Sequence, residues 1–324
     1  APLSTLSGDL AGRFVDAEGH FIVVGADARH GDGTRWSRET LAGNRPLDAV
    51  WGADGVAFAG GYEGRVARWN GSRWSAETTG TTLDVNAVSG LSASDVWAVG
   101  EHGLIAHLTG DAWTVLSAGP TSDLEGVHGL GPSDVLAVGH ELSIHWDGAT
   151  WSSAGPADVE LEALGGAGGE LVAVGTGGAI RLYTNGVWST EASGSDAKLE
   201  GVWSDRAGHA FAVGGAAFLE RAGSAWTALP DHPPSLAVWG ASATDVWAVG
   251  PAGAAPFDGS AWPASPGSAG PALFGVWGSS ASDVWAVGAG GTILHFDGRT
   301  WATAASHTSQ DLVGVWGSGP SDVW

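Results

Sequence analysis

Short apolar runs separated by polar turns recur along the whole chain with a single period. The clearest unit begins at Leu273 and reads L-F-G-V-W-G-S-S-A-S-D-V-W-A-V-G-A-G-G-T-I-L-H-F-D-G-R-T-W. A period of this length decides the architecture, because each unit is one supersecondary motif that buries its apolar face against the next unit. Its closing tryptophan returns at intervals of 38, 39, 38, 37, 38, 36 and 39 residues, at Trp36, Trp74, Trp113, Trp151, Trp188, Trp226, Trp262 and Trp301.

Each unit contains four apolar runs. They read L-x-G-V-W-G, D-V-W-A-V-G and T-I-L-H-F, and the fourth run begins at the closing tryptophan. The segments between them, S-x-S-D, a glycine pair, and D-G or N-G, are typical of tight turns. Short runs rich in Val and Trp predict β-strands, and the intervals leave no room for an ordinary helix. Four antiparallel strands per unit predict the blade of a β-propeller.

The whole chain is therefore expected to form a single all-β propeller domain of four-stranded blades. We expect eight blades, with seven or nine as alternatives, because the first unit already contains all four runs. The last two runs then either displace the poorly matching segment 10–25 or begin a ninth blade. The repeat units span approximately residues 10–41, 47–80, 85–120, 124–157, 161–194, 199–232, 235–268 and 273–308, with a partial unit at 312–324.

Several repeated positions are interpreted as structural. The fourth-strand tryptophans are expected to anchor the outer strands. The third-strand histidines His107, His145 and His295 are expected to bond the adjacent turn, with Asp147 and Asp297 two residues further on. The second-strand position is apolar in every unit and is expected to lie in the core between blades: Ile22, Phe58, Trp97, Leu136, Val172, Phe211, Trp247, Trp285 and Trp324.

The third-to-fourth turn, H-F-D-G-R-T-W at 295–301, resembles the Asp-box hairpin of sialidases and related propellers, although His replaces the hydroxyl residue and the spacing is one residue shorter. The whole unit more closely resembles the G-V-W-G-S-S-x-S-D-V-W-A-V-G repeats of exported bacterial propeller proteins. This resemblance covers about 300 residues and implies the fold and an exported bacterial protein. It implies little about activity, since the hairpins recur in enzymes and binding proteins alike.

Composition narrows the function further. The 324 residues include 13 Lys+Arg against 35 Asp+Glu, for a formal net charge of −22, and contain no Cys. The charge argues against a nucleic-acid partner, and the missing Cys excludes disulfides and thiol chemistry. No apolar stretch is long enough for a membrane helix, so we expect no membrane insertion. A single lysine, no cysteine, and a chain opening Ala-Pro-Leu without Met indicate a secreted, periplasmic or cell-surface location.

One repeated position departs from the structural pattern. The second residue of the first strand is polar or acidic in five successive units and apolar in the last three, and first strands line the central channel. In three of the acidic units, the first-strand Trp is also replaced, by Ser89, His128 and Gly165. Smaller side chains in place of tryptophan, next to a group of carboxylates, predict a ligand-binding pocket at one mouth of the channel. Its candidate residues are Asp48, Asn86, Glu125, His128, Glu162 and Glu200.

Three functions remain open. The favoured one is an exported, non-enzymatic scaffold that binds a glycan or peptide ligand or a protein partner, either as a monomer or in a larger extracellular assembly. The second is a glycan-active hydrolase or lyase that uses acids of the channel mouth, such as Glu125 and Glu162. The third is a purely structural module. No catalytic residue, metal ligand or cofactor is assigned, and Ca²⁺ is the one cation that the acidic mouth suggests.

Overall fold

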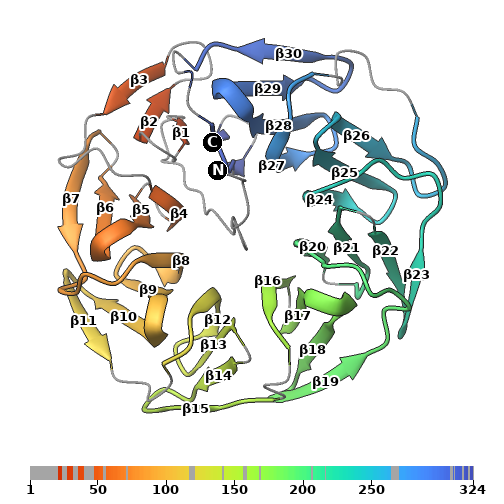
Figure 1. Ribbon diagram of the computed structural model, residues 1–324. Helices are drawn as coiled ribbons and strands as arrows, with labels where there is room; N and C mark the ends of the chain where they lie inside the picture. The colour runs from red at the N-terminus through yellow and green to blue at the C-terminus, as the bar shows by residue number, and fades with distance from the viewer. Residues whose placement is uncertain are drawn as a thin grey trace, which may run out of the picture.

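The computed structural model describes residues 21–23, 28–31, 36–39, 47–53, 56–70, 72–116, 121–140, 142–155, 159–167, 169–205, 207–215, 217–263, 270–306, 309, 311–315, 317–319 and 322–323. Within these residues the chain consists of antiparallel β-sheets and four single-turn 3₁₀ helices. Eight sheets of three or four strands follow one another around a ring (Figure 1). The predicted all-β propeller is confirmed.

Six of the sheets have four strands in up-and-down order. They are β4 (Leu47–Ala53), β5 (Val56–Gly61), β6 (Arg65–Trp69) and β7 (Trp74–Thr78); β8 (Val85–Ser92), β9 (Asp95–Gly100), β10 (Leu104–Thr109) and β11 (Ala112–Leu116); β12 (Leu124–Gly131), β13 (Asp134–Gly139), β14 (Leu142–Trp146) and β15 (Trp151–Ser153); β16 (Leu161–Ala167), β17 (Glu170–Gly175), β18 (Ile180–Thr184) and β19 (Val187–Glu191); β20 (Gly201–Ser204), β21 (Ala210–Gly214), β22 (Ala217–Ala222) and β23 (Ala225–Ala228); and β27 (Leu273–Ser280), β28 (Asp283–Gly288), β29 (Thr292–Phe296) and β30 (Trp301–Ala304).

The remaining sheets are smaller. Two have three described strands, β1 (Phe21–Val23), β2 (Ala28–Gly31) and β3 (Trp36–Glu39), and β24 (Ala237–Ser242), β25 (Asp245–Gly250) and β26 (Gly253–Phe257). The last sheet is a two-stranded hairpin of β31 (Gly317–Gly319) and β32 (Asp322–Val323). The 3₁₀ turns η1 (Tyr62–Gly64), η2 (Glu101–Gly103), η3 (Thr176–Gly178) and η4 (Ala289–Gly291) connect second to third strands.

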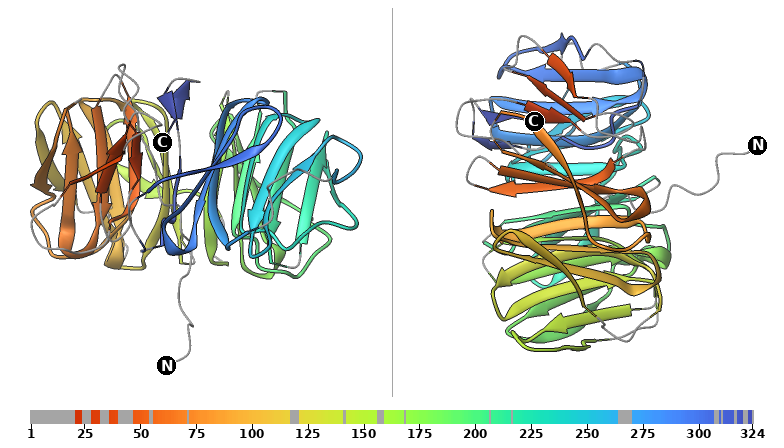
Figure 2. Two further views of the ribbon diagram at one scale, coloured as in Figure 1. Left: turned by 90° about the horizontal axis from the view of Figure 1, so that it is seen from above. Right: turned by 90° about the vertical axis from the view of Figure 1, so that its left-hand side faces the viewer.

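The ring is a flat disc when it is seen edge-on, and the strands run between its two faces (Figure 2). In each four-stranded blade the first strand lies nearest the centre and the fourth lies at the circumference (Figure 1). First strands therefore position side chains around the central opening, while second and third strands are packed between neighbouring blades.

The core lies between blades, as the repeat predicts. The second-strand residues from Phe58 to Trp285 are all buried, and none is more than 5% exposed. Ile22 and Trp324 lie outside the residues whose side chains are described. Trp97 shows how one seam is filled, because it packs against Trp146 and Trp151 of the next blade at centroid distances of 5.2 and 5.3 Å. Aromatic rings at this spacing stabilise a core beyond the area that they bury.

The third-strand histidines have partners other than those expected. His107 Nε2 lies 2.8 Å from Asp95 Oδ1, and His295 Nε2 lies 2.6 Å from Asp283 Oδ1, so each ring bonds the first residue of its second strand. The aspartate of the following turn instead accepts two backbone N–H bonds, which lower the pKa of Asp297. The aspartate of this turn thus forms an ordinary Asx turn, and the histidine belongs to a separate Asp-His pair.

The seventh blade departs from the four-stranded prediction because of proline. Residues 258–263 form the expected turn, in which Asp258 N–H donates to the Ala261 carbonyl, but they pair as no fourth strand. Pro256 would face Pro263 if the register of the other blades continued, and neither residue has an N–H to donate. The sheet therefore ends at β26 among the described residues.

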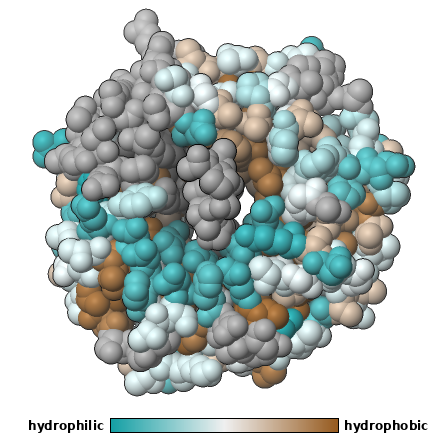
Figure 3. Space-filling model, in the orientation of Figure 1, coloured by the Kyte–Doolittle hydropathy of each residue, from teal (hydrophilic) through white to brown (hydrophobic). Residues whose placement is uncertain are grey.

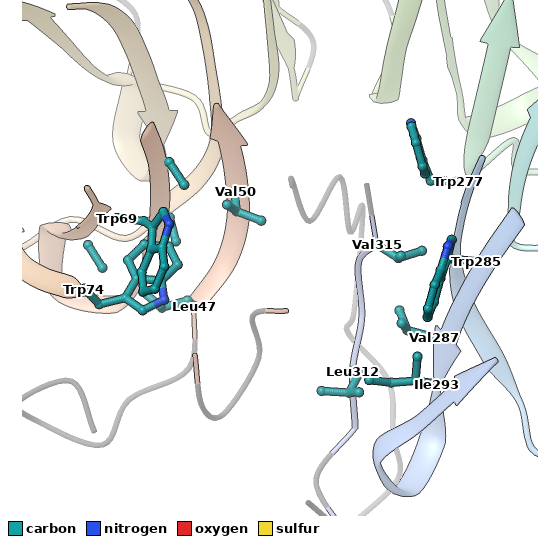
Figure 4. Packing of buried hydrophobic residues seen from close by; sticks show 13 residues of the cluster. Leu47, Val50, Trp69, Trp74, Trp277, Trp285, Val287, Ile293, Leu312 and Val315 are labelled. Atoms are coloured by element: carbon teal, nitrogen blue, oxygen red, sulfur yellow. The ribbon is translucent and has the colours of Figure 1, made fainter. Parts of the chain in front are cut away.

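The start of the ninth repeat lies where the next blade's first strand would begin. Leu312 N–H donates to the Gly288 carbonyl at 3.0 Å, which is the same contact that Leu199 makes to Gly175 between two complete blades. Leu312 and Val315 pack beside Val287 and neighbouring residues of the eighth blade (Figure 4). The end of the chain thus extends the ring past β27–β30 toward the sheet β1–β3, while segment 10–20, expected to begin the first unit, lies outside the described residues.

Candidate functional site: the anionic mouth of the central cavity

A cavity of about 430 Å³ occupies the centre of the ring. Its walls come from the first strands of seven successive blades, from Val50 to Phe274, together with Val313. Indole rings of Trp51, Trp203 and Trp239 form much of the wall, and His128 and Glu200 are among its polar groups. The volume lies within the range typical of ligand pockets. The cavity thus lies beside Ser89 and His128, two of the positions at which the first-strand tryptophan is replaced.

A β-bulge positions the side chains at the mouth of this cavity. In five of the described blades the pairing register shifts at the second residue of the first strand, for example between Leu124 and Gly126 and between Leu161 and Ala163. The extra residues are Glu125 and Glu162. A bulge removes its residue from the regular ladder and redirects its side chain. The same shift occurs at positions 48, 86 and 274, so the acidic position of the repeat is a bulge position.

Glu125 lies in a cluster that joins two blades. It is 6% exposed, and its Oε1 lies 3.8 Å from His140 Nε2. The same imidazole nitrogen lies 2.8 Å from Oε1 of Glu160 in the next blade. Burial raises the pKa of Glu125 to about 7; His140 opposes this shift, and the neighbouring carboxylates add to it. The carboxyl group is therefore partly protonated near neutral pH.

Glu162 continues the cluster into a third blade. It is 1% exposed, and Lys198 Nζ lies 3.0 Å from its Oε1. Its Oε2 accepts no hydrogen bond from a described residue. Burial raises the pKa of Glu162, and Lys198 reduces that shift. Glu200 lies close enough to add to the shift, and its own Oε2 accepts a bond from Gly215 N–H at 3.4 Å.

We call the four glutamates Glu125, Glu160, Glu162 and Glu200 the anionic mouth. Two basic side chains, His140 and Lys198, accompany these four carboxyl groups. Figure 3 shows hydrophilic side chains gathered along the edge of the central opening beside β8, β12 and β16. The mouth therefore carries more negative than positive charge, and one of its carboxylate oxygens lacks a donor.

Other predicted residues have different roles. Asn86 Nδ2 donates to the Leu124 carbonyl at 3.1 Å and so joins two first strands. Asp84 and Asp123 accept backbone N–H bonds of 2.7 Å from the 3₁₀ turns of the preceding blades. These three side chains connect blades. The side chain of Asp48 lies outside the described residues.

His128 lies in the cavity wall beside Ser89 and Gly129. Burial lowers the pKa of His128, so the imidazole is neutral at physiological pH. It makes no hydrogen bond to any other described residue. The imidazole therefore has hydrogen-bonding capacity left for a ligand in the cavity.

The structure thus clusters Glu125, Glu162 and Glu200, and it places Glu200 and His128 in the wall of the cavity. The sequence interpretation missed His140 and Lys198 as members of that site. Lys198 is the single lysine of the chain and lies two residues before Glu200, which is a signal that was present. His140 directly follows its second strand, where it reaches across the blade boundary, and nothing in the repeat pattern predicts that direction.

The described residues contain no group of three or more His, Asp or Glu side chains arranged to hold a metal ion. No helix within the described ranges is long and apolar enough to cross a membrane.

Comparison with known proteins identifies the fold. No protein-family model and no curated protein matches the sequence. Among solved structures, the computationally designed Ika8 protein is similar with a TM-score of 0.72 and 13% identity, over 86% of this chain and 96% of that one. The WD40 β-propeller domain of Doa1 gives a TM-score of 0.54 and 11% identity, over 86% and 94%. YCF48 bound to D1 peptide gives a TM-score of 0.57 and 16% identity, over 74% and 89%. At these identities the similarity shows that the chain has the β-propeller fold.

Proposed function

We propose that this protein is a non-enzymatic interaction scaffold that binds a lysine- or arginine-containing peptide segment of a partner protein at the anionic mouth. The observation that carries the proposal is the cluster of Glu125, Glu162 and Glu200 in three successive blades, of which Glu200 lines the 430 Å³ cavity. Eight similar blades without a recognisable catalytic motif favour a binding protein, as the sequence does.

The electrostatics of the mouth favour a cationic ligand. Holding Glu125 and Glu162 as buried carboxylates is costly, and the raised pKa of each group measures that cost. An ammonium or guanidinium group between them would offset the cost and would donate to the free Oε2 of Glu162. The overall charge of −22 would also accelerate encounter with a basic segment.

The structural neighbours support a peptide ligand over a glycan. YCF48, which shares the fold, has been solved with a bound D1 peptide. The checkpoint complex that contains another similar chain is a protein assembly. Binding of a glycan through carboxylate-to-hydroxyl bonds would be the competing outcome of a binding screen.

A binding measurement with variants of the mouth tests the proposal. We expect a short Lys/Arg-rich peptide to bind at low ionic strength, and its affinity to fall as salt is added. Removing all three charges with Glu125→Gln, Glu162→Gln and Glu200→Gln should abolish binding, and Glu200→Gln alone should weaken it about tenfold. Asp196→Asn removes one exposed charge from a loop of the fifth blade and is the matched control. Equal binding by the triple variant and the control would refute the proposal.

A glycan-active enzyme is the second candidate, and the pKa of Glu125 favours it. A carboxyl group with a pKa of about 7 beside other carboxylates is the kind of group that serves as a general acid. Release of reducing ends from an oligosaccharide library, lost in Glu125→Gln, would establish this activity. Peptide binding without any turnover would favour the scaffold.

We also propose that the protein acts outside the cytoplasm, in agreement with its resemblance to exported bacterial repeats and with a composition of no cysteine and one lysine. Fractionation of the producing cells, with detection of the protein in the cytoplasm alone, would contradict this location.

A further inference from the structure

The first-strand tryptophans form an interrupted layer around the cavity. The indole of Trp51 covers Gly90 of the next blade so closely that a Cβ there would lie 2.7 Å from the ring. Trp203 covers Gly240 in the same way, with a corresponding distance of 3.0 Å. Each tryptophan thus closes the inner surface of the blade that follows it.

Three successive blades, those that begin with β8, β12 and β16, supply no indole to cover the blade that follows. The equivalent residues are Ser89, His128 and Gly165, none of which carries an indole. Leu91 partly replaces the first missing ring, because its Cδ2 would lie 3.0 Å from a Cβ on Gly129. Ser89, His128 and Gly129 line the cavity on this side, and Trp51, Trp203 and Trp239 line other parts of it.

The interruption lies in the same blades as the anionic mouth. Ser89, His128 and Gly165 belong to β8, β12 and β16, and Glu125 and Glu162 belong to β12 and β16. Glu200 belongs to the anionic mouth and also lines the cavity, so a ligand held at the mouth by its cationic group can reach into the cavity.

We propose that the cavity binds one aromatic side chain of the partner in place of the missing indoles, next to the cationic residue held at the mouth. The inference rests on the proposed function, and it specifies the ligand as a peptide with an aromatic residue beside Lys or Arg. Indole walls favour an aromatic ring through edge-to-face contacts. The neutral imidazole of His128 and the hydroxyl of Ser89 can bond a tyrosine O–H or a tryptophan N–H.

Two peptides separate this inference from the proposed function. The first contains Lys and Arg with Ala between them, and the second has one of those alanines replaced by Trp. Isothermal titration calorimetry at low salt should give binding of both peptides, with the Trp peptide at least about tenfold tighter because it buries an aromatic side chain. Equal affinities would overturn the aromatic site and leave the basic-peptide scaffold standing.

The variant His128→Trp restores the residue that the sister blades use and fills the cavity. We expect it to remove the advantage of the Trp peptide over the all-basic peptide. Ser89→Trp is the second filling variant in case the first does not fold, as judged by thermal melting. Val187→Trp adds an indole to an outer strand, at a residue that is 66% exposed, and is the control.

Two further outcomes also test the aromatic site. If His128→Trp weakens both peptides equally, the cavity holds the cation itself and the aromatic site is wrong. If neither peptide binds, N-acetyltryptophanamide is used as a probe in ligand-observed NMR. Binding of that probe to the wild type and its loss in His128→Trp would support the aromatic site without the basic scaffold, and no binding would overturn both.

Discussion

The imidazole of His107 stacks on the indole of Trp97, with ring centres 3.7 Å apart and planes 9° from parallel. The same imidazole bonds Asp95 at 2.8 Å. Trp285 and His295 repeat this stack in the eighth blade, with ring centres 3.9 Å apart. The histidine therefore joins the carboxylate at the start of the second strand to the aromatic residue in the interior of the blade.

Removal of this carboxylate should destabilise the blade. Asp95→Ala leaves His107 without its acceptor, and we expect a loss of about 1–2 kcal/mol in the free energy of unfolding. The measurement is urea denaturation followed by circular dichroism.

The seventh blade supplies the control for this prediction. Its third strand has Pro256 where a histidine would lie, and Asp245 makes no hydrogen bond to a described residue. Burial raises the pKa of Asp245, so its ionised form is disfavoured in the folded protein. Asp245→Ala should therefore be neutral or stabilising at pH 7. An equal loss in the two variants would show that the Asp-His pair contributes nothing of its own.

Glu125 should make stability depend on pH. Its pKa is raised in the folded protein, from 4.5 to about 7, so the folded state binds more protons than the unfolded state between these values. Stability is then lost as the pH rises through this window. Glu125→Gln removes the effect, and we expect it to be roughly 2–3 kcal/mol more stable than wild type at pH 8 and equal to it near pH 4.

Asp123, His140, Glu160 and Glu162 also face Glu125, and His140 opposes the shift while the three carboxylates add to it. The comparison is therefore made as a difference between variant and wild type across the pH range. A difference that does not change with pH would show that Glu125 keeps an ordinary pKa.

Backbone strain in a 3₁₀ turn should be relieved by glycine. His102 has φ 51° and ψ 32° in η2, a left-handed conformation that disfavours a side chain, and η4 has Gly290 at the same position with φ 62°. We expect His102→Gly to stabilise the protein by about 1 kcal/mol.

The reverse substitution, Gly290→Ala, should cost about 1 kcal/mol. Since no atom lies within 4 Å of a Cβ at Gly290, its cost would be conformational. Thermal melts of both variants test this pair. Destabilisation by His102→Gly would mean that the imidazole makes a contact that outweighs the strain.

Glu191 holds the fifth and sixth blades together. It accepts bonds from Arg221 Nε at 2.9 Å and from Trp226 Nε1 at 2.7 Å. Glu191→Ala would leave a buried guanidinium without one of its two carboxylates and a buried indole N–H without an acceptor, and we expect a loss of about 3–5 kcal/mol.

Glu77 is the matched residue three blades earlier. Its bond to Trp113 Nε1 is 2.9 Å long, and its nearest contact to a cation, Arg68, is 3.9 Å. Glu77→Ala should cost only about 1 kcal/mol. Similar losses in the two variants would indicate that the guanidinium finds other acceptors when Glu191 is absent.

The repeat predicts the blades because its period, its turn residues and its apolar positions all agree. The burial of Phe58, Leu136 and Phe211 follows from that agreement. The missing fourth strand of the seventh blade could also have been predicted from the sequence, since Pro256 and Pro263 occupy facing positions of the expected hairpin. The pairing of His107 with Asp95 required the register of two antiparallel strands, which the alignment of repeats alone does not supply.

The candidate site was predicted in part. The acidic series that includes Glu125, Glu162 and Glu200 is visible once the units are aligned. The contacts of His140 and Lys198 cannot be seen in the aligned units. Each contact crosses the boundary between two blades and depends on how the neighbouring sheets are placed. The bulge was missed as well, since a bulge adds a residue without altering the apolar pattern around it.

That bulge has an evolutionary consequence. The residue at its apex is outside the hydrogen-bonded ladder, so exchanging a glutamate there for phenylalanine, as position 274 illustrates, leaves strand pairing intact. Each of the five blades that have this bulge thus offers one interchangeable position on a shared frame. Propellers of this kind can change their ligand preference through single substitutions at these positions while the pairing of the strands stays the same.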